Sequence, residues 1–67
     1  MPELLSSEKG YNFVVYAGRV YALAHTIGHV DLTLESSTLI QRFGPKAVIV
    51  ANSVAEARAR VAAVSRH

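Results

Sequence analysis

The stretch Tyr11–His25, YNFVVYAGRVYALAH, decides the fold of this chain. It holds two runs rich in aromatic and β-branched residues, over 11–16 and 19–25, and such residues favour pleated strands. Only Ala17-Gly18 separates the runs, and glycine tolerates the positive φ that a tight turn needs. The sequence therefore predicts an antiparallel β-hairpin. Because Ala17 is not a residue that this turn prefers, a longer loop stays open as an alternative.

Counting outward from the turn predicts the register. If Tyr16 lies opposite Arg19, alternation along the strands sorts the side chains into two faces. We expect the first face to point to the core, because it is apolar apart from one phenol hydroxyl. Its members are Tyr11, Phe13, Val15, Val20, Ala22 and Ala24. The second face is mixed, and we take it as the candidate interaction face. Its members are Asn12, Val14, Tyr16, Arg19, Tyr21, Leu23 and His25. A slip of one residue would mix the two sets, so the pattern favours this register.

The C-terminal part of the chain predicts a strand and then a helix. Ala47–Ala51, AVIVA, is an unbroken apolar run, which is typical of a strand covered on both faces. Ser53 and Glu56 match a capping box that opens a helix over the following residues. One apolar stripe of this helix is expected to face the core: Val54, Ala57, Val61 and Val64. A second strip is either a tolerant surface or a place where another helix approaches closely: Ala55, Ala59, Ala62 and Ala63.

The middle of the chain allows two interpretations. Val30–Glu35, VDLTLE, alternates apolar and polar residues, which predicts a short third strand. A short helix would follow, capped at Ser36 or Ser37 and ended by Gly44-Pro45. Alternatively, Asp31 caps a single helix that runs to Phe43. We favour the first interpretation, because Thr and Ser are mediocre helix formers.

Together these elements predict an α+β fold in the order β-β-(β)-α-β-α. A small sheet based on an antiparallel hairpin would carry the C-terminal helix on one face. Its other face would stay open unless a partner covers it. Residues 1–10 are expected to form a flexible lead-in, and 11–67 a single domain.

Composition narrows the function. The 67 residues are 51% hydrophobic and 18% charged, against about 25% charged in typical domains. A chain this small without cysteines often gains stability by oligomerising, so we expect a self-association surface. The net charge of +2 comes from scattered residues, whereas a nucleic-acid site needs clustered ones. No run approaches the ~20 apolar residues that span a membrane, and the first ten residues lack signal-peptide features, so we expect a cytoplasmic protein.

Motifs for catalysis do not emerge from the sequence. It contains no G-x-S-x-G elbow, no G-x-G-x-x-G and no P-loop, so we expect no enzymatic activity and no cofactor. His25, His29 and Asp31 have the residue types of metal ligands. However, Gly28 separates the two histidines and the context is strand then loop, so their convergence is not specified and we expect no metal site.

Three segments carry a family resemblance: YNFVVYAGRVYALA (11–24), IGHVDL (27–32) and AVIVANSVAEA (47–57). They resemble short bacterial modules that occur alone or appended to glycosyltransferase-like and other polysaccharide-associated proteins. Those modules combine a tyrosine-rich hairpin, a Gly-x-Val-Asp-Leu turn, a short apolar strand and a capped helix. Where this chain has Ala24-His25, they usually carry Pro-Gln or a similar pair. The resemblance covers roughly residues 11–64 and implies an accessory role without catalytic residues.

These observations lead to one function hypothesis and two alternatives. The first is a small, non-enzymatic protein-interaction module that forms a homo-oligomer. The second is carbohydrate or nucleotide-sugar binding through the aromatic sheet face. The third is nucleic-acid binding, which only the basic charge balance favours.

Overall fold

The central hairpin forms in the predicted register. In the computed structural model, β2 (Tyr11–Tyr16) and β3 (Arg19–Ala24) pair antiparallel, with Tyr16 opposite Arg19 and Tyr11 opposite Ala24. Ala17 has φ 52° and Gly18 φ 76°, so both turn residues adopt the left-handed region that the two-residue hairpin turn with matching twist requires. The alternative of a longer loop is therefore wrong.

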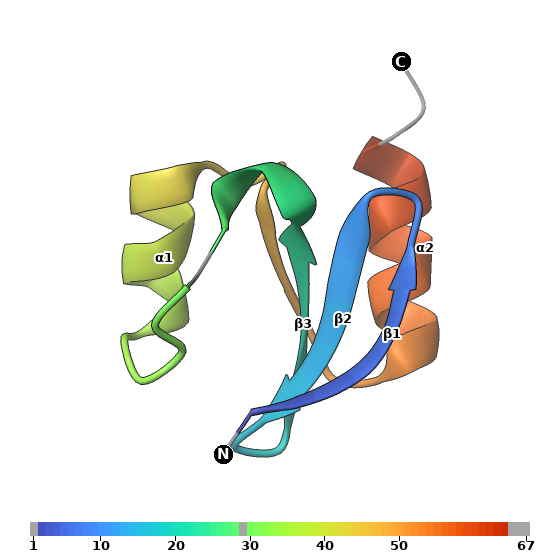
Figure 1. Ribbon diagram of the computed structural model, residues 1–67, viewed down its shortest axis with the longest axis horizontal. Helices are drawn as coiled ribbons and strands as arrows, with labels where there is room; N and C mark the ends of the chain where they lie inside the picture. Colours follow the sequence, from blue (N-terminus) through green and yellow to red (C-terminus); the bar gives the residue numbers. More distant parts are fainter. Residues whose placement is uncertain (1, 29, 65–67) are drawn as a thin grey trace.

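The structure describes residues 2–28 and 30–64, and its strands form one antiparallel sheet (Figure 1). The sheet has four strands in the order β1-β2-β3-β4, where β1 is Glu3–Glu8 and β4 is Val48–Ala51. With two α-helices added, the predicted α+β class is confirmed. The predicted strand at 47–51 is confirmed as well, and it pairs with β3.

Strand β1 corrects the expectation of a flexible lead-in over residues 1–10. Glu3–Glu8 pairs with β2, and a two-residue turn at Lys9-Gly10 joins them, with φ 53° and 82°. The pairing satisfies the backbone groups along the outer side of β2. This strand was not predicted because its sequence shows no regular alternation of apolar and polar residues. A bulge between Leu4 and Ser6 interrupts its register, and both Leu4 and Leu5 are exposed.

The predicted third strand at Val30–Glu35 is wrong. Residues 30–35 form a turn, in which Asp31 accepts hydrogen bonds from the Thr33 amide (3.0 Å) and hydroxyl, and the Leu34 amide bonds to the Asp31 carbonyl. An aspartate closes such a turn through its own side chain. The Leu32 side chain packs in the core and is 6% exposed. The alternation of apolar and polar residues that resembled a strand arises because Leu32 is buried in the core while Asp31 and Thr33 are exposed.

Helix α1 (Ser36–Phe43) follows that turn. Neither expected cap forms: Glu35 holds the N-cap position and its side chain accepts no hydrogen bond from the first-turn amides, so Ser36, Ser37 and the alternative Asp31 do not cap this helix. The predicted C-terminal stop is confirmed. Gly44 has φ 102°, and its amide donates to the Ile40 carbonyl at 2.7 Å.

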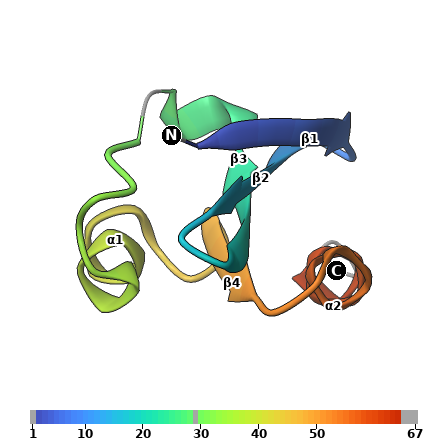
Figure 2. The same cartoon turned by 90° about the horizontal axis from the view of Figure 1, so that it is seen from below.

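Helix α1 and the C-terminal helix lie on opposite sides of the sheet (Figures 1 and 2). A cluster of buried residues lies on each side. On one side, helix α2 (Val54–Val64) packs its predicted stripe against the apolar hairpin face around Phe13, which is 1% exposed. Ser53 accepts the predicted cap bond from the Glu56 amide at 3.1 Å. The Glu56 carboxylate does not complete the box, because it pairs with Arg60 at 2.9 Å.

The second side of the sheet is covered, not open as expected. Helix α1 and the turn before it place Leu32 and Leu39 against Val14, Tyr21 and Val48. The expectation failed because it assumed a strand at 30–35, which would have joined the sheet edge. As a turn, this segment carries α1 across the face instead.

Candidate functional site

Helix α1 and the turn before it cover the middle of the predicted interaction face and divide it into two ends. Its three central residues, Val14, Tyr21 and Leu23, are 9%, 4% and 8% exposed and belong to the core beneath α1. Tyr21 is therefore unavailable for stacking on a ligand. The expectation that the tyrosines of this face point outward is wrong for Tyr21.

The remaining members separate to the two ends of the hairpin. Half-buried Tyr16 and exposed Arg19 lie opposite one another beside the turn. Asn12 and His25 lie at the far end, where His25 opens the 3₁₀ turn η1 (His25–Ile27) rather than ending β3. The structure thus brings Asn12 and His25 together and leaves Tyr16 and Arg19 outside that group.

An open hollow of about 640 Å³ lies at the Asn12 and His25 end. Four predicted face residues line it: Asn12, Val14, Leu23 and His25. Five residues that the sequence reasoning missed complete it: Pro2, Leu4, Gly28, Val30 and Leu32. Pro2 and Leu4 belong to the expected flexible lead-in, Val30 and Leu32 to the expected third strand, and Gly28 to the loop between the hairpin and that strand. The only sequence signal for them was the apolar character of Leu4, Val30 and Leu32.

A short polar chain borders this hollow. The Ser7 hydroxyl donates to Asn12 Oδ1 at 2.6 Å, and His25 Nε2 lies 2.9 Å from the same oxygen. Because that amide oxygen can only accept, His25 donates through Nε2, and its Nδ1 is left to accept when the ring is neutral. Asn12 Nδ2 makes no hydrogen bond with the described residues. The arrangement therefore offers the Asn12 NH2 group as a donor and, with a neutral ring, His25 Nδ1 as an acceptor, beside an apolar floor of Val14, Leu23 and Leu32.

A metal centre finds no support among residues 2–28 and 30–64, which contain no group of three histidine, aspartate or glutamate side chains able to hold an ion. His29, one member of the set considered from the sequence, lies outside the described residues. Asp31 is engaged in its own turn, where the hydrogen bonds from Thr33 hold the pKa of its carboxyl below the usual range.

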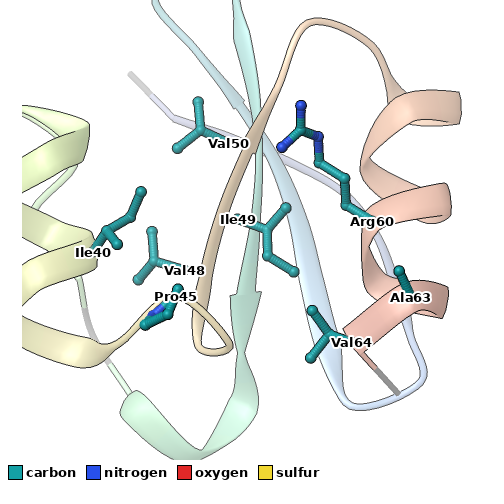
Figure 3. Close-up of a pocket in the computed structure, with 8 residues that line it drawn as sticks. All are labelled: Ile40, Pro45, Val48, Ile49, Val50, Arg60, Ala63 and Val64. Carbon is teal, nitrogen blue, oxygen red and sulfur yellow. The ribbon is translucent and has the colours of Figure 1, made fainter. Parts of the chain in front are cut away.

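A second hollow, of about 360 Å³, follows the outer edge of β4 between the two helices (Figure 3). Ile40 from α1, with Val48 and Val50, bounds one side, while Ala63 and Val64 from α2, with Ile49, bound the other. Arg60 reaches from α2 toward the strand (Figure 3). This hollow is apolar except for Arg60, and Pro45 is its remaining lining residue.

The edge of β4 also presents unpaired backbone groups. The Ala24 amide donates to the Ala47 carbonyl at 2.9 Å, so alternation assigns the hydrogen-bonded pairs of β3 and β4 to Ala22–Ile49 and Val20–Ala51. The backbone N–H and C=O groups of Val48 and Val50 therefore point away from the sheet. No strand among residues 2–28 and 30–64 pairs with β4 on that side, so the half-buried Val50 offers a donor and an acceptor to an incoming strand.

Comparison with known proteins assigns no family to this chain: no family model, no curated protein and no solved structure matches it. Within the described part of the chain, neither helix is long and apolar enough to cross a membrane.

Proposed function

We propose that this chain is a small, non-enzymatic, cytoplasmic interaction module of accessory role that associates with itself. The single observation that carries the proposal is the contrast between the two edges of its sheet. An edge strand is a template for pairing with another chain, and proteins that remain monomeric usually protect their edges.

Strand β1 carries such protection. Pro2 precedes it, Glu3 and Glu8 stand at its ends, and the bulge between Leu4 and Ser6 breaks its regular spacing. Charges, proline and bulges are among the devices that prevent edge-to-edge pairing. The β1 edge therefore disfavours association.

Strand β4 carries none of these devices. Its four residues, VIVA, include no charge and no proline, and its pairing with β3 is regular. The apolar hollow beside it adds side-chain contacts to any strand that pairs there. These features support self-association through this edge.

Sedimentation velocity of the purified chain over about 1–300 μM, a span chosen around the micromolar affinities of weak complexes, tests the proposal. We expect a reversible shift from the 7.2 kDa monomer to a dimer. A single monomer species at the highest concentration would contradict self-association.

The hollow beside Asn12 and His25 favours a second candidate function, the binding of a small ligand such as a carbohydrate or nucleotide sugar. An apolar pocket with a few polar groups is the usual form of a ligand site. The buried Tyr21 removes one stacking surface on which the sequence hypothesis relied, so recognition would depend on hydrogen bonds from Asn12 and His25.

Amide-shift titration with a panel of sugars and nucleotide sugars tests this candidate. We expect shifts at Asn12, Leu23 and His25, and their loss in Asn12→Ala. Arg19→Ala serves as the control, because Arg19 is exposed and does not line the hollow. Amide shifts confined to Arg19 and other charged residues outside the hollow would contradict a site in the hollow.

A further inference from the structure

We infer that the hollow beside Asn12 and His25 binds an uncharged amphipathic molecule. Its hydroxyl-bearing head group contacts these two side chains, and its hydrocarbon part covers the apolar residues around them. The inference rests on the second candidate function, small-ligand binding in this hollow. It narrows the ligand to a sugar that carries an alkyl or similar apolar substituent.

The bulge in β1 turns two of its residues toward this hollow. Residues that pair across antiparallel strands place their side chains on the same face of the sheet. Leu4 pairs with Val14, which lines the hollow, and Ser7 pairs with Asn12. Residues three apart in a regular strand would lie on opposite faces, so it is the unpaired Leu5 that brings Leu4 and Ser7 to one face. Bulges often redirect side chains in this way beside functional sites.

The same register keeps the carboxylates of β1 away from the hollow. Glu8 pairs with Tyr11 on the face that α2 covers, and its carboxylate contacts Arg58 there. Glu3 pairs with Val15, which alternation along β2 places on that same face. Strand β1 therefore contributes an apolar wall and a hydroxyl to the hollow, but no charge.

The rest of the lining is uncharged as well. Among residues 2–28 and 30–64, no aspartate, glutamate, lysine or arginine lines the hollow. Asp31 lies between two lining residues, but its carboxylate accepts hydrogen bonds from Thr33. A charged ligand would lose hydration here without gaining an ion pair, and burying an unpaired charge is costly. The lining therefore favours an uncharged ligand.

The polar groups at the border of the hollow suit hydroxyl groups. Asn12 Oδ1 accepts from the Ser7 hydroxyl at 2.6 Å and from His25 Nε2 at 2.9 Å, which orients the side-chain amide and directs its NH2 group elsewhere. With a neutral ring, His25 Nδ1 is an acceptor. Hydroxyls both donate and accept, so a sugar ring can satisfy the NH2 group and Nδ1 together. A carboxylate can only accept, so it leaves Nδ1 without a donor.

Most of the remaining surface of the hollow is hydrocarbon. Leu4 is 60% exposed, which leaves much of its side chain in contact with water. A ligand with an apolar part removes this surface from water, whereas a bare sugar removes little of it. The volume of about 640 Å³ lies within the range of small-molecule sites. The apolar lining residues are Pro2, Leu4, Val14, Leu23, Val30 and Leu32.

Three probes test the ligand class: hexyl β-glucoside, methyl β-glucoside and hexanoate. Each is titrated into the full chain below the concentration at which it forms micelles, at about pH 8, where a histidine ring in water is neutral. We expect hexyl β-glucoside to shift the amides of Leu4, Asn12 and Leu23. It should bind at least about tenfold more tightly than methyl β-glucoside, because its chain buries additional methylene groups. Hexanoate has a similar chain but a charged head, and it should also bind at least about tenfold more weakly.

A leucine pair tests the position of the hydrocarbon part. Leu4→Ser removes an apolar wall, and we expect it to weaken hexyl β-glucoside about fivefold while leaving methyl β-glucoside unchanged. Leu5→Ser is the matched control, because Leu5 is also exposed on β1 but does not line the hollow. Both side chains are exposed, so neither change removes a core contact.

An asparagine pair tests the head group. Asn12→Asp keeps an oxygen that accepts hydrogen bonds but removes the NH2 donor, so the affinity for hexyl β-glucoside should fall about tenfold. Asn52→Asp introduces the same charge at an exposed residue outside the hollow, and it should leave the affinity unchanged.

The outcomes separate this inference from the proposed functions. If no glucoside, sugar or nucleotide sugar binds, small-ligand binding and this inference both fail, while self-association is unaffected. If methyl β-glucoside or hexanoate binds as tightly as hexyl β-glucoside, or if Leu5→Ser weakens binding as much as Leu4→Ser, the amphipathic class is wrong although ligand binding stands. Tighter binding of hexyl β-glucoside that Leu4→Ser and Asn12→Asp weaken, and that both controls preserve, supports the inference.

Discussion

At the scale of single residues, the position of Tyr21 decides what this protein can present to its surroundings. Its ring lies under α1 at 4% exposure, while Tyr16 and Arg19, which lie nearer the turn on the same face, are half-buried and exposed. Alternation along β3 correctly assigned Tyr21 to the face opposite the C-terminal helix. It could not show that this face would be covered, because the cover comes from residues 30–43.

Replacing Tyr21 tests its structural role. We expect Tyr21→Ala to lower the free energy of unfolding by about 3–5 kcal/mol, because it removes a buried aromatic ring and leaves a cavity. Tyr21→Phe keeps the ring, and the hydroxyl makes no hydrogen bond within the described residues, so this variant should remain close to wild type. Thermal unfolding followed by circular dichroism measures both, and equal stability of Tyr21→Ala and wild type would contradict the burial.

Ala17 is a residue in a conformation that it does not prefer. Its φ of 52° lies in the left-handed region, which costs L-residues other than glycine, asparagine and aspartate about 1–2 kcal/mol. Ala17→Asn creates the Asn-Gly pair that this turn favours, so we expect stability to rise by about 0.5–1 kcal/mol. The same substitution at exposed Ala59, within a helix, should lower stability. An unchanged or lower melting temperature for Ala17→Asn would contradict the turn conformation.

At the scale of elements, the two helices begin in different ways. α2 starts with a serine whose side chain accepts the Glu56 amide, while α1 starts without any side-chain cap. Helix α1 is stabilised instead by packing, because Leu39 is fully buried against the sheet. Cap motifs in the sequence therefore identified one helix start and misassigned the other.

Two serine variants separate these cases. Ser53→Ala should cost about 1 kcal/mol, which in a domain of this size lowers the melting temperature by about 4–8 °C. Ser37→Ala is the matched control, and it should leave stability unchanged or slightly higher, since alanine is the better helix former. A larger loss at position 37 than at 53 would reverse the assignment of the caps.

At the scale of the whole molecule, one ion pair joins the two ends of the described chain. Arg58 on α2 contacts Glu8 on β1, with 2.7 Å between Nη2 and Oε2. The hydrogen bond from Arg58, together with its charge, lowers the pKa of the Glu8 carboxyl below its usual value of 4.5. The contact links the edge strand β1 to the C-terminal helix.

The sign of this shift predicts a pH dependence. A carboxyl whose pKa is lower in the folded state stabilises the fold above its unfolded pKa, and this contribution disappears as pH falls through the folded pKa. We expect Glu8→Gln to melt below wild type at pH 7, with the difference vanishing well below pH 4.5. Because the pair is exposed, the effect should be small and reduced by salt. Glu3→Gln, on the same strand but without an ion pair to the described residues, should show no such convergence.

Four of the nine residues that line the candidate site were predictable, and the reason is geometric. Hairpin alternation placed Asn12, Val14, Leu23 and His25 on one face, and these four line the larger hollow. Its other walls come from Pro2 and Leu4, at the start of the chain, and from residues 28–32. The positions of these residues depend on long-range pairing of β1 and on a turn closed by Asp31. No local pattern specifies either of these.

The sequence by itself determined the hairpin, its register, the apolar strand at 47–51 and the capped C-terminal helix. Each of these depends on interactions between residues close along the chain, or on a periodicity that a strand or helix imposes. Only the tertiary structure decided that β1 joins the sheet, that α1 closes the second face over Tyr21, and that the outer edge of β4 stays unpaired. Each of those outcomes depends on contacts between segments that are far apart in the sequence. The free energy of burial that stabilises such contacts comes from many residues at once, so no local pattern specifies it.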